Sequence, residues 1–314
     1  MIAALLVFAY GVAVAWWLPT LLTPLTRSGA GARLGMIAWL TAMASALVSV
    51  GVALALLIRS AVTGWSRLAE VVCREVSGGA CTPVVYRSAL YELGLGLAAL
   101  LATLTAITLT WRYGRRLQQA RRRTRAHAEA ARITGRHLPA DTSGMVVLDA
   151  SQLAAYCVPG RPGTIVVTSG ALAILEPAQL GAVLAHERAH LAGRHHLLVA
   201  LTRGLAAVFP AVPLFTRGPV EVARLAEMRA DDAAALRAGR RPLIEALLAM
   251  GTGAAVPVPV AALAAAGYAV AARVQRLLEP PHRASRTRHA LALICVLLVL
   301  PVVSALVFAL ASSS

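Results

Sequence analysis

The residues best suited to chemistry lie in one short stretch, residues 182–196, which reads AVLAHERAHLAGRHH. It contains HERAH, a match to the pattern H-E-x-x-H, with His186, Glu187 and His190 at the fixed positions. On a helix, the two histidines lie one turn apart on the same face. Imidazoles at this spacing can bind one zinc ion, and the glutamate beside them can take a proton from bound water. The stretch therefore predicts a zinc site.

The sequence around the motif predicts that it lies on a helix. Glu176-Pro177 is typical of a helix N-terminus, and leucine and valine residues then repeat with a period near 3.6. Arg194, His195 and His196 come near the expected end of this helix. They are either additional ligands or cationic side chains that stabilise a helix C-terminus. The alternative for the whole motif is a polar helix face that carries two solvated histidines.

A second group of acidic residues favours the zinc interpretation. The stretch RLAEMRADD at 224–232 places Glu227 and Asp231 four residues apart, on one face of a predicted helix. A catalytic zinc has three protein ligands and an open position for water, so Glu227 can be the third ligand. Asp231 can then accept a hydrogen bond from the second ring nitrogen of a ligating histidine and so fix its tautomer. The alternative is a solvated helix with alternating charges.

The composition indicates a membrane protein. Hydrophobic residues make up 58% of the chain and the mean hydropathy is +0.70, which excludes an ordinary soluble domain. The net charge is +16, and every basic residue is arginine. Such a charge is typical of nucleic-acid-binding proteins or of membrane proteins with basic cytoplasmic flanks. The positions of the arginines favour the second class.

Four uncharged runs are long enough to cross a bilayer, which takes about 20 apolar residues. They are residues 1–26, 34–58, 93–111 and 290–310. Residues 112–136 hold nine arginines and one acidic residue, so the positive-inside rule places this stretch in the cytoplasm. Both termini are then expected outside. Because basic stretches beside a span bind anionic lipids, no direct contact with nucleic acid is expected.

These runs divide the chain into three parts. Residues 1–111 are predicted to form three transmembrane helices with an outer loop at 59–88. Residues 112–288 are predicted to form the cytoplasmic catalytic domain, and residues 289–314 a C-terminal transmembrane helix. Within the domain, residues 197–216 are apolar and interrupted by prolines, which fits either a hairpin dipping into the membrane or a buried helix.

The four cysteines fall into two groups. Cys73 and Cys81 lie in the predicted outer loop, where an oxidising compartment permits a disulfide, although two unpaired thiols are the alternative. Cys157 and Cys295 are predicted to be free.

Residues 145–168 have the character of a small sheet that precedes the motif helix. Residues 145–148 and 154–157 are short strand candidates, residues 159–163 form a turn, and residues 164–168 are rich in β-branched side chains.

The paired motifs, H-E-R-A-H followed by E-x-x-A-D, resemble those of the gluzincin membrane peptidases. The segments LAHERAHLAGRHHLL and CVPGRPGTIVVTSGAL are most similar to the BlaR/MecR-type antirepressor metallopeptidases, and the CAAX-protease and heat-shock membrane proteases are more distant. The resemblance covers about residues 145–278. It implies His186, His190 and Glu227 as zinc ligands and Glu187 as the catalytic acid/base. No penicillin-binding domain with an S-x-x-K motif is present, so sensing of β-lactams by this chain is not expected.

The resemblance also implies residues that contact the substrate. An edge strand often holds the substrate backbone in peptidases of this shape, and the expected strand consists of Thr164, Ile165, Val166, Val167 and Thr168. A plain core hairpin is the alternative. Arg273 and Arg276 are expected to face the cleft, where either could bind a substrate carbonyl or stabilise the oxyanion. A basic surface or a lipid headgroup contact is the alternative for these arginines.

The resulting expectation is a mainly α membrane protein with about four transmembrane helices and a zincin-like α+β metallopeptidase domain that carries a small β-sheet. Its expected function is Zn²⁺-dependent hydrolysis of peptide bonds in a protein substrate, such as a helix-turn-helix repressor, at the cytoplasmic side of the cell membrane. A heat-shock-type quality-control protease and a non-catalytic membrane sensor or scaffold are the alternatives. The sequence does not indicate an oligomeric state.

Overall fold

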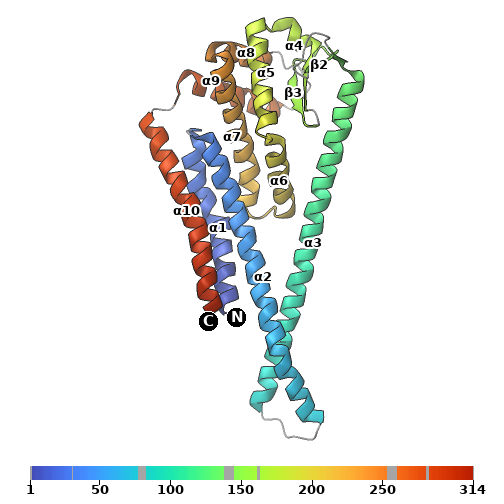
Figure 1. Cartoon of the computed structure of the whole chain (residues 1–314), viewed down its shortest axis with the longest axis vertical. Coiled ribbons are helices and arrows are strands. Elements are labelled where there is room, and N and C mark those ends of the chain that lie inside the picture. The colour runs from blue at the N-terminus through green and yellow to red at the C-terminus, as the bar shows by residue number, and fades with distance from the viewer. Residues whose placement is uncertain are drawn as a thin grey trace.

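The chain forms a bundle of long helices with a head of shorter helices and a small sheet at one end (Figure 1). The computed structural model describes residues 2–29, 31–76, 83–137, 145–160, 163–252, 260–280 and 283–313. Both chain ends lie on the side away from the head, part of the way along the bundle, and two of the long helices continue beyond them.

Three long helices could cross a membrane by length and composition. They are α1 (Ile2–Arg27), α2 (Ala32–Val76) and α3 (Pro83–Thr134), with apolar segments at Ile2–Arg27, Ala32–Gly64 and Leu90–Ala126. Only 6% of the apolar window of α3 is buried, so its large side chains face outward, as in contact with lipid. The first three predicted spans thus lie on such helices.

The fourth predicted span lies on α10 (Arg283–Ser313). Within the part of α10 whose side chains are described, the apolar stretch Thr287–Leu300 is shorter than a span requires. The count of four transmembrane helices therefore stays a prediction. Cys157 and Cys295 are free, as predicted. The predicted pair of Cys73 and Cys81 lies outside what the structure describes, because Cys81 falls between the described ranges and the side chain of Cys73 is not described.

The sheet has the strand order β1-β2-β4-β3. Strands β2 and β4 are parallel, and β3 runs antiparallel to β4 with Cys157 opposite Ile165. The predicted strands at 145–148 and 164–168 are confirmed, and the third begins one residue later than predicted. The bounds are β1 (Arg136–His137), β2 (Met145–Leu148), β3 (Ala155–Val158) and β4 (Thr164–Thr168).

The prediction that Thr164–Thr168 is an edge strand is wrong. Strand β4 lies between β2 and β3, and all five of its residues are buried. Its unbroken β-branched and apolar run is typical of an interior strand that is covered on both faces. Within the described part of the sheet, β3 is the outer strand next to β4, and its other edge pairs with no strand.

The helix that carries H-E-x-x-H, α5 (Pro177–Ala192), begins where the sequence predicts. Glu176 is its N-cap and exchanges hydrogen bonds with Gln179 in a capping box, and Pro177 occupies the first turn. Val183 and Leu184 pack against the sheet. The remaining helices of the head are α4 (Ser169–Ile174), α6 (His195–Val208), α7 (Pro213–Ala238), α8 (Arg240–Thr252) and α9 (Val260–Leu278).

Residues 197–216 form a helical hairpin made of α6 and the start of α7. The hairpin extends down from the head beside α1 and α2 (Figure 1). Leu214 and Phe215, near its tip, are buried in the same apolar cluster as Trp39 and Met43 of α2. The segment is therefore a helical hairpin whose tip is buried against α2, and its entry into the membrane stays a prediction. Helix α7 then continues without interruption into the head.

Candidate metal centre

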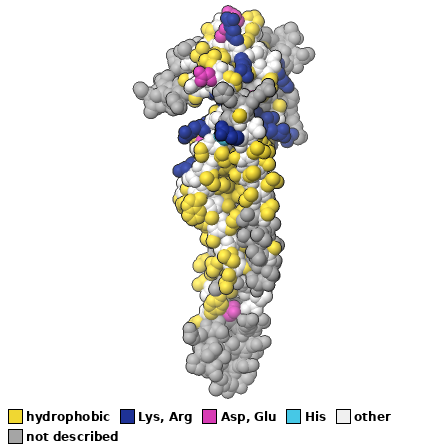
Figure 2. All heavy atoms as spheres, turned by 90° about the vertical axis from the view of Figure 1, so that its left-hand side faces the viewer, with side chains coloured by type: hydrophobic (Ala, Val, Ile, Leu, Met, Phe, Trp, Pro, Cys, Tyr) yellow, Lys and Arg dark blue, Asp and Glu magenta, His cyan; other side chains and the backbone are white. Residues whose placement is uncertain are grey.

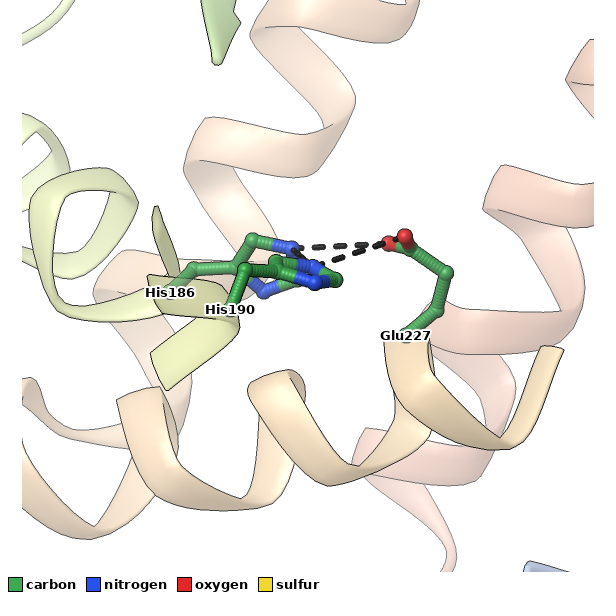
Figure 3. A group of neighbouring side chains, drawn as sticks. All are labelled: His186, His190 and Glu227. Atoms are coloured by element: carbon green, nitrogen blue, oxygen red, sulfur yellow. Dashed lines mark hydrogen bonds and ion pairs between the residues drawn. The ribbon is translucent and has the colours of Figure 1, made fainter. Parts of the chain in front are cut away.

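Two packed helices bring the predicted ligands together. His186 and His190 extend from α5, and Glu227 extends from α7 toward both of them (Figure 3). Small buried residues, Ala182 and Ala185 on α5, line the face that packs near α7. Because alanine has only a methyl side chain, the two helices can approach closely enough for these three longer side chains to meet.

The spacing of the ligand atoms suits one tetrahedral metal ion. The Nε2 atoms of His186 and His190 are 3.0 Å apart. Glu227 places its carboxylate oxygens 3.4 Å from each of these nitrogens. Ligands that lie about 2.0–2.1 Å from a tetrahedral zinc are about 3.3–3.4 Å apart. The two distances to Glu227 match this separation, and the two imidazole nitrogens lie slightly closer together.

Asp231 lies behind His186, on the side away from the metal group. Its Oδ1 atom is 3.1 Å from Nδ1 of His186, a hydrogen-bonding distance whose direction is not ideal. The carboxylate is fully buried. Burial raises the pKa of Asp231, but hydrogen bonds from Arg273 and His186 more than offset this and lower it. Asp231 is therefore a buried carboxylate beside one candidate ligand, as the spacing of the second motif predicts.

The two predicted arginines of α9 occupy different places. Arg273 donates two hydrogen bonds to Asp231, at 2.9 and 2.6 Å, and lies 3.3 Å from Glu227. Arg276 instead donates to both carboxylate oxygens of Asp232 at 2.7 Å. Arg273 thus contacts the metal group, and Arg276 fastens α9 to α7 beside it.

Glu187 lies on α5 next to His186, in a partly enclosed position. Burial, the largest effect, raises the pKa of its carboxyl group, although the neighbouring histidines oppose this. The thiol of Cys157 on β3 hydrogen-bonds to Glu187, and burial together with this carboxylate raises the pKa of the thiol to about 12. Sequence reasoning missed this contact, because it depends on the register of β3 against β4 and leaves no mark in residue spacing.

His195 also makes a contact that the sequence did not predict. It begins α6, is 2% exposed, and its Nδ1 atom lies 2.9 Å from Nδ1 of His190. Burial and the neighbouring His190 and Arg229 lower its pKa to about 4. Its position five residues after His190 is the one signal that could have suggested the contact.

A cleft of about 990 Å³ lies next to the metal group. Its lining includes Glu227 and Glu221 of α7, Ala269 and Ala272 of α9, and the last turn of α1. Arg224 holds the helices together here by donating to the carbonyl oxygens of Thr26 and Arg27, each at 3.0 Å. Figure 2 shows arginine side chains gathered where the apolar helix bundle meets the head. Because four arginines line the cleft, it lies near this boundary.

A family model described as peptidase family M48 matches residues 117–280, just over half of the chain. The matched segment begins in α3 and extends past α9, so it contains the sheet and both metal motifs. No curated protein and no solved structure matches the chain.

Proposed function

The chain belongs to peptidase family M48, and we propose that it is a zinc metalloendopeptidase that cuts protein substrates at the cytoplasmic surface of a membrane. The observation that carries the proposal is the group of His186, His190 and Glu227, with ligand separations of 3.0–3.4 Å on an H-E-x-x-H helix. The apolar helices α1, α2 and α3 support membrane attachment.

In the proposed mechanism, each residue near the metal group has a separate task. His186, His190 and Glu227 would hold a zinc ion, which when bound would act as a Lewis acid and lower the pKa of the attacking water. Glu187 accepts the proton of the water and delivers it to the leaving amine. The raised pKa of Glu187 suits this role, because a general base works best when its pKa approaches the working pH.

Asp231 and Arg273 keep the ligands in place. The buried Asp231 orients the ring of His186, and Arg273 neutralises both Asp231 and Glu227. Arg273 is also near enough to the metal group to bind a substrate carbonyl, whereas Arg276 is already paired with Asp232. We place the substrate backbone along the free edge of β3, beside Glu187, where it can add a strand to the sheet.

A metal and cleavage assay of the purified full-length chain tests the proposal. We expect about one zinc per chain, cleavage of an unfolded protein, loss of cleavage with a chelator, and recovery when zinc is restored. A chain that binds no divalent metal would instead be a non-catalytic sensor or scaffold.

Metal uptake should depend on pH. Burial lowers the pKa of His186, but hydrogen bonds with Asp231 and Glu227 outweigh this and raise it to about 9. In the metal-free protein the ring is therefore protonated at neutral pH, and a metal must displace that proton. We expect the apparent zinc affinity to rise by about tenfold per pH unit below pH 9 and then to level off. Chelator competition across this range measures it, and a flat profile would contradict the assignment.

The position of the cleft favours one substrate class over another. An antirepressor of the BlaR/MecR type and a quality-control protease share the same chemistry and differ in substrate. The cleft joins Glu227 to the end of α1, at the boundary between the apolar bundle and the head. This arrangement supports cleavage of segments that lie next to the membrane in other membrane proteins, as in the quality-control function.

Filling the cleft should therefore block membrane-anchored substrates. Ala272 lines the cleft, whereas its neighbour Ala271 is exposed on α9 and does not line it. We expect Ala272→Trp to slow cleavage of an anchored substrate with zinc content unchanged, and Ala271→Trp to behave like the parent. Cleavage of the same site is measured in anchored and soluble form. Equal rates for both forms in the parent would favour a soluble substrate such as a repressor.

A further inference from the structure

Among the described residues, His195 contacts a candidate ligand histidine with an imidazole that is not itself one of the three candidate ligands. The rings of His190 and His195 meet edge to face, with centroids 4.8 Å apart and an interplanar angle of 89°. Their Nδ1 atoms are 2.9 Å apart, and His195 is almost completely buried. The contact is therefore short, and the His195 side of it is buried.

The direction of this contact follows from the orientation of His190. Its Nε2 atom faces His186 and Glu227, which leaves Nδ1 to carry the ring proton when Nε2 binds a metal. Nδ1 of His190 then donates, and Nδ1 of His195 accepts. Because Nδ1 of His195 points at the outer nitrogen of His190, His195 is not a further ligand of this metal group.

The local backbone is built to bring His195 to this place. Arg194 has φ 49°, a left-handed conformation that is unfavourable for a residue with a side chain, and it turns the chain sharply from α5 into α6. Gly193 has an ordinary helical φ of −77°, so its backbone does not require glycine. A Cβ atom there would instead collide with Nε2 and Cδ2 of the His195 ring. The glycine therefore makes room for the ring.

We propose that His195 is a positioning residue, which accepts the Nδ1 proton of His190 and so holds the Nε2 atom of that ligand toward the metal. This rests on the proposed zinc site. The two ligand histidines then have different outer partners: the carboxylate of Asp231 behind His186 and the imidazole of His195 behind His190. Outer partners of this kind fix the tautomer and the ring orientation of a ligand.

Two substitutions of similar size separate the acceptor from the packing. His195→Asn keeps an acceptor atom near the place of Nδ1, whereas His195→Leu has none. We expect His195→Leu to weaken zinc binding about 10- to 100-fold, as loss of an outer partner does, and His195→Asn to stay close to the parent. His196→Asn is the control, because His196 lies next in the chain but is not part of the metal group. Chelator competition gives the affinity, and the absorption spectrum of the cobalt-substituted protein reports ligand geometry.

Gly193→Ala tests the same idea without removing a polar group. Its methyl group should displace the His195 ring and reproduce the loss of affinity seen with His195→Leu. The double variant Gly193→Ala/His195→Leu should bind zinc no more weakly than either single variant, because both substitutions remove the same contact. Thermal unfolding of each zinc-free variant confirms that it is folded.

The outcomes separate this inference from the proposed function. Zinc bound equally well by the parent, His195→Leu and Gly193→Ala overturns the positioning role alone. The positioning role is also overturned if His195→Leu and His195→Asn lower the zinc affinity equally and the effects of Gly193→Ala and His195→Leu add in the double variant. Packing would then be the cause of the loss. A parent chain that binds no zinc overturns the proposed function and this inference with it.

Discussion

Glu187→Gln should bind zinc as the parent does and lose cleavage by about 10²- to 10⁴-fold, the range that general acid/base groups contribute. The amide has almost the same shape as the carboxylate but cannot accept the proton of the bound water. Glu187 is not among the three side chains whose atoms converge in the metal group, so zinc content should not change. Single-turnover cleavage and metal analysis of the same sample measure both quantities.

A matched control for this variant is Glu245→Gln on α8, where the carboxylate pairs with the exposed Arg241 and is not part of the metal group. It should cut like the parent. If Glu187→Gln cleaves substrate as fast as the parent, the proposed mechanism is wrong. If the inactive variant keeps its zinc, it is also suited to trap the natural substrate, which can then be identified.

Glu227→Ala should lose zinc, with a fall in affinity greater than the roughly 100-fold that loss of an outer-shell partner costs. Removal of this carboxylate leaves two imidazoles, one fewer protein ligand than catalytic zinc sites have. The fold should survive, because Arg273 keeps its two hydrogen bonds to Asp231. Chelator competition measures the loss.

The comparison variant here is Glu245→Ala, which removes a carboxylate of the same kind from the surface of α8 and should leave zinc affinity unchanged. Full zinc occupancy in Glu227→Ala at limiting metal would exclude Glu227 as the third ligand. Cleavage activity should fall with zinc content and recover in part when excess zinc is added.

The sequence alone predicted the parts of this molecule that depend on local spacing. The boundary of α5 at Pro177 followed from capping chemistry, and the convergence of His186, His190 and Glu227 followed from the ligand number of zinc. Both inferences use distances along a single helix or a rule of coordination chemistry.

Features that depend on contacts between distant segments were not predictable in the same way. The composition of β4 marked it as a strand, but its place between β2 and β3 depends on pairing across the sheet. The contact between Cys157 and Glu187 has the same origin. The division of labour between Arg273 and Arg276 depends on how α9 lies against α7. In each case the sequence gives the residue type, but tertiary packing determines which residue it contacts.

Helix α7 has a mechanical consequence for the metal group. It is one continuous helix from Pro213, beside the apolar bundle, past Pro219 to Glu227 in the head, a distance of about 21 Å at 1.5 Å per residue. A tilt of about 3° around its lower end moves the carboxylate by about 1 Å over that length, which is half of a zinc–ligand bond. A small movement of the hairpin therefore produces a larger displacement of Glu227, the third candidate ligand. In the proposed zinc site, a shift of α1 or α2 against the hairpin would therefore be passed along α7 to Glu227.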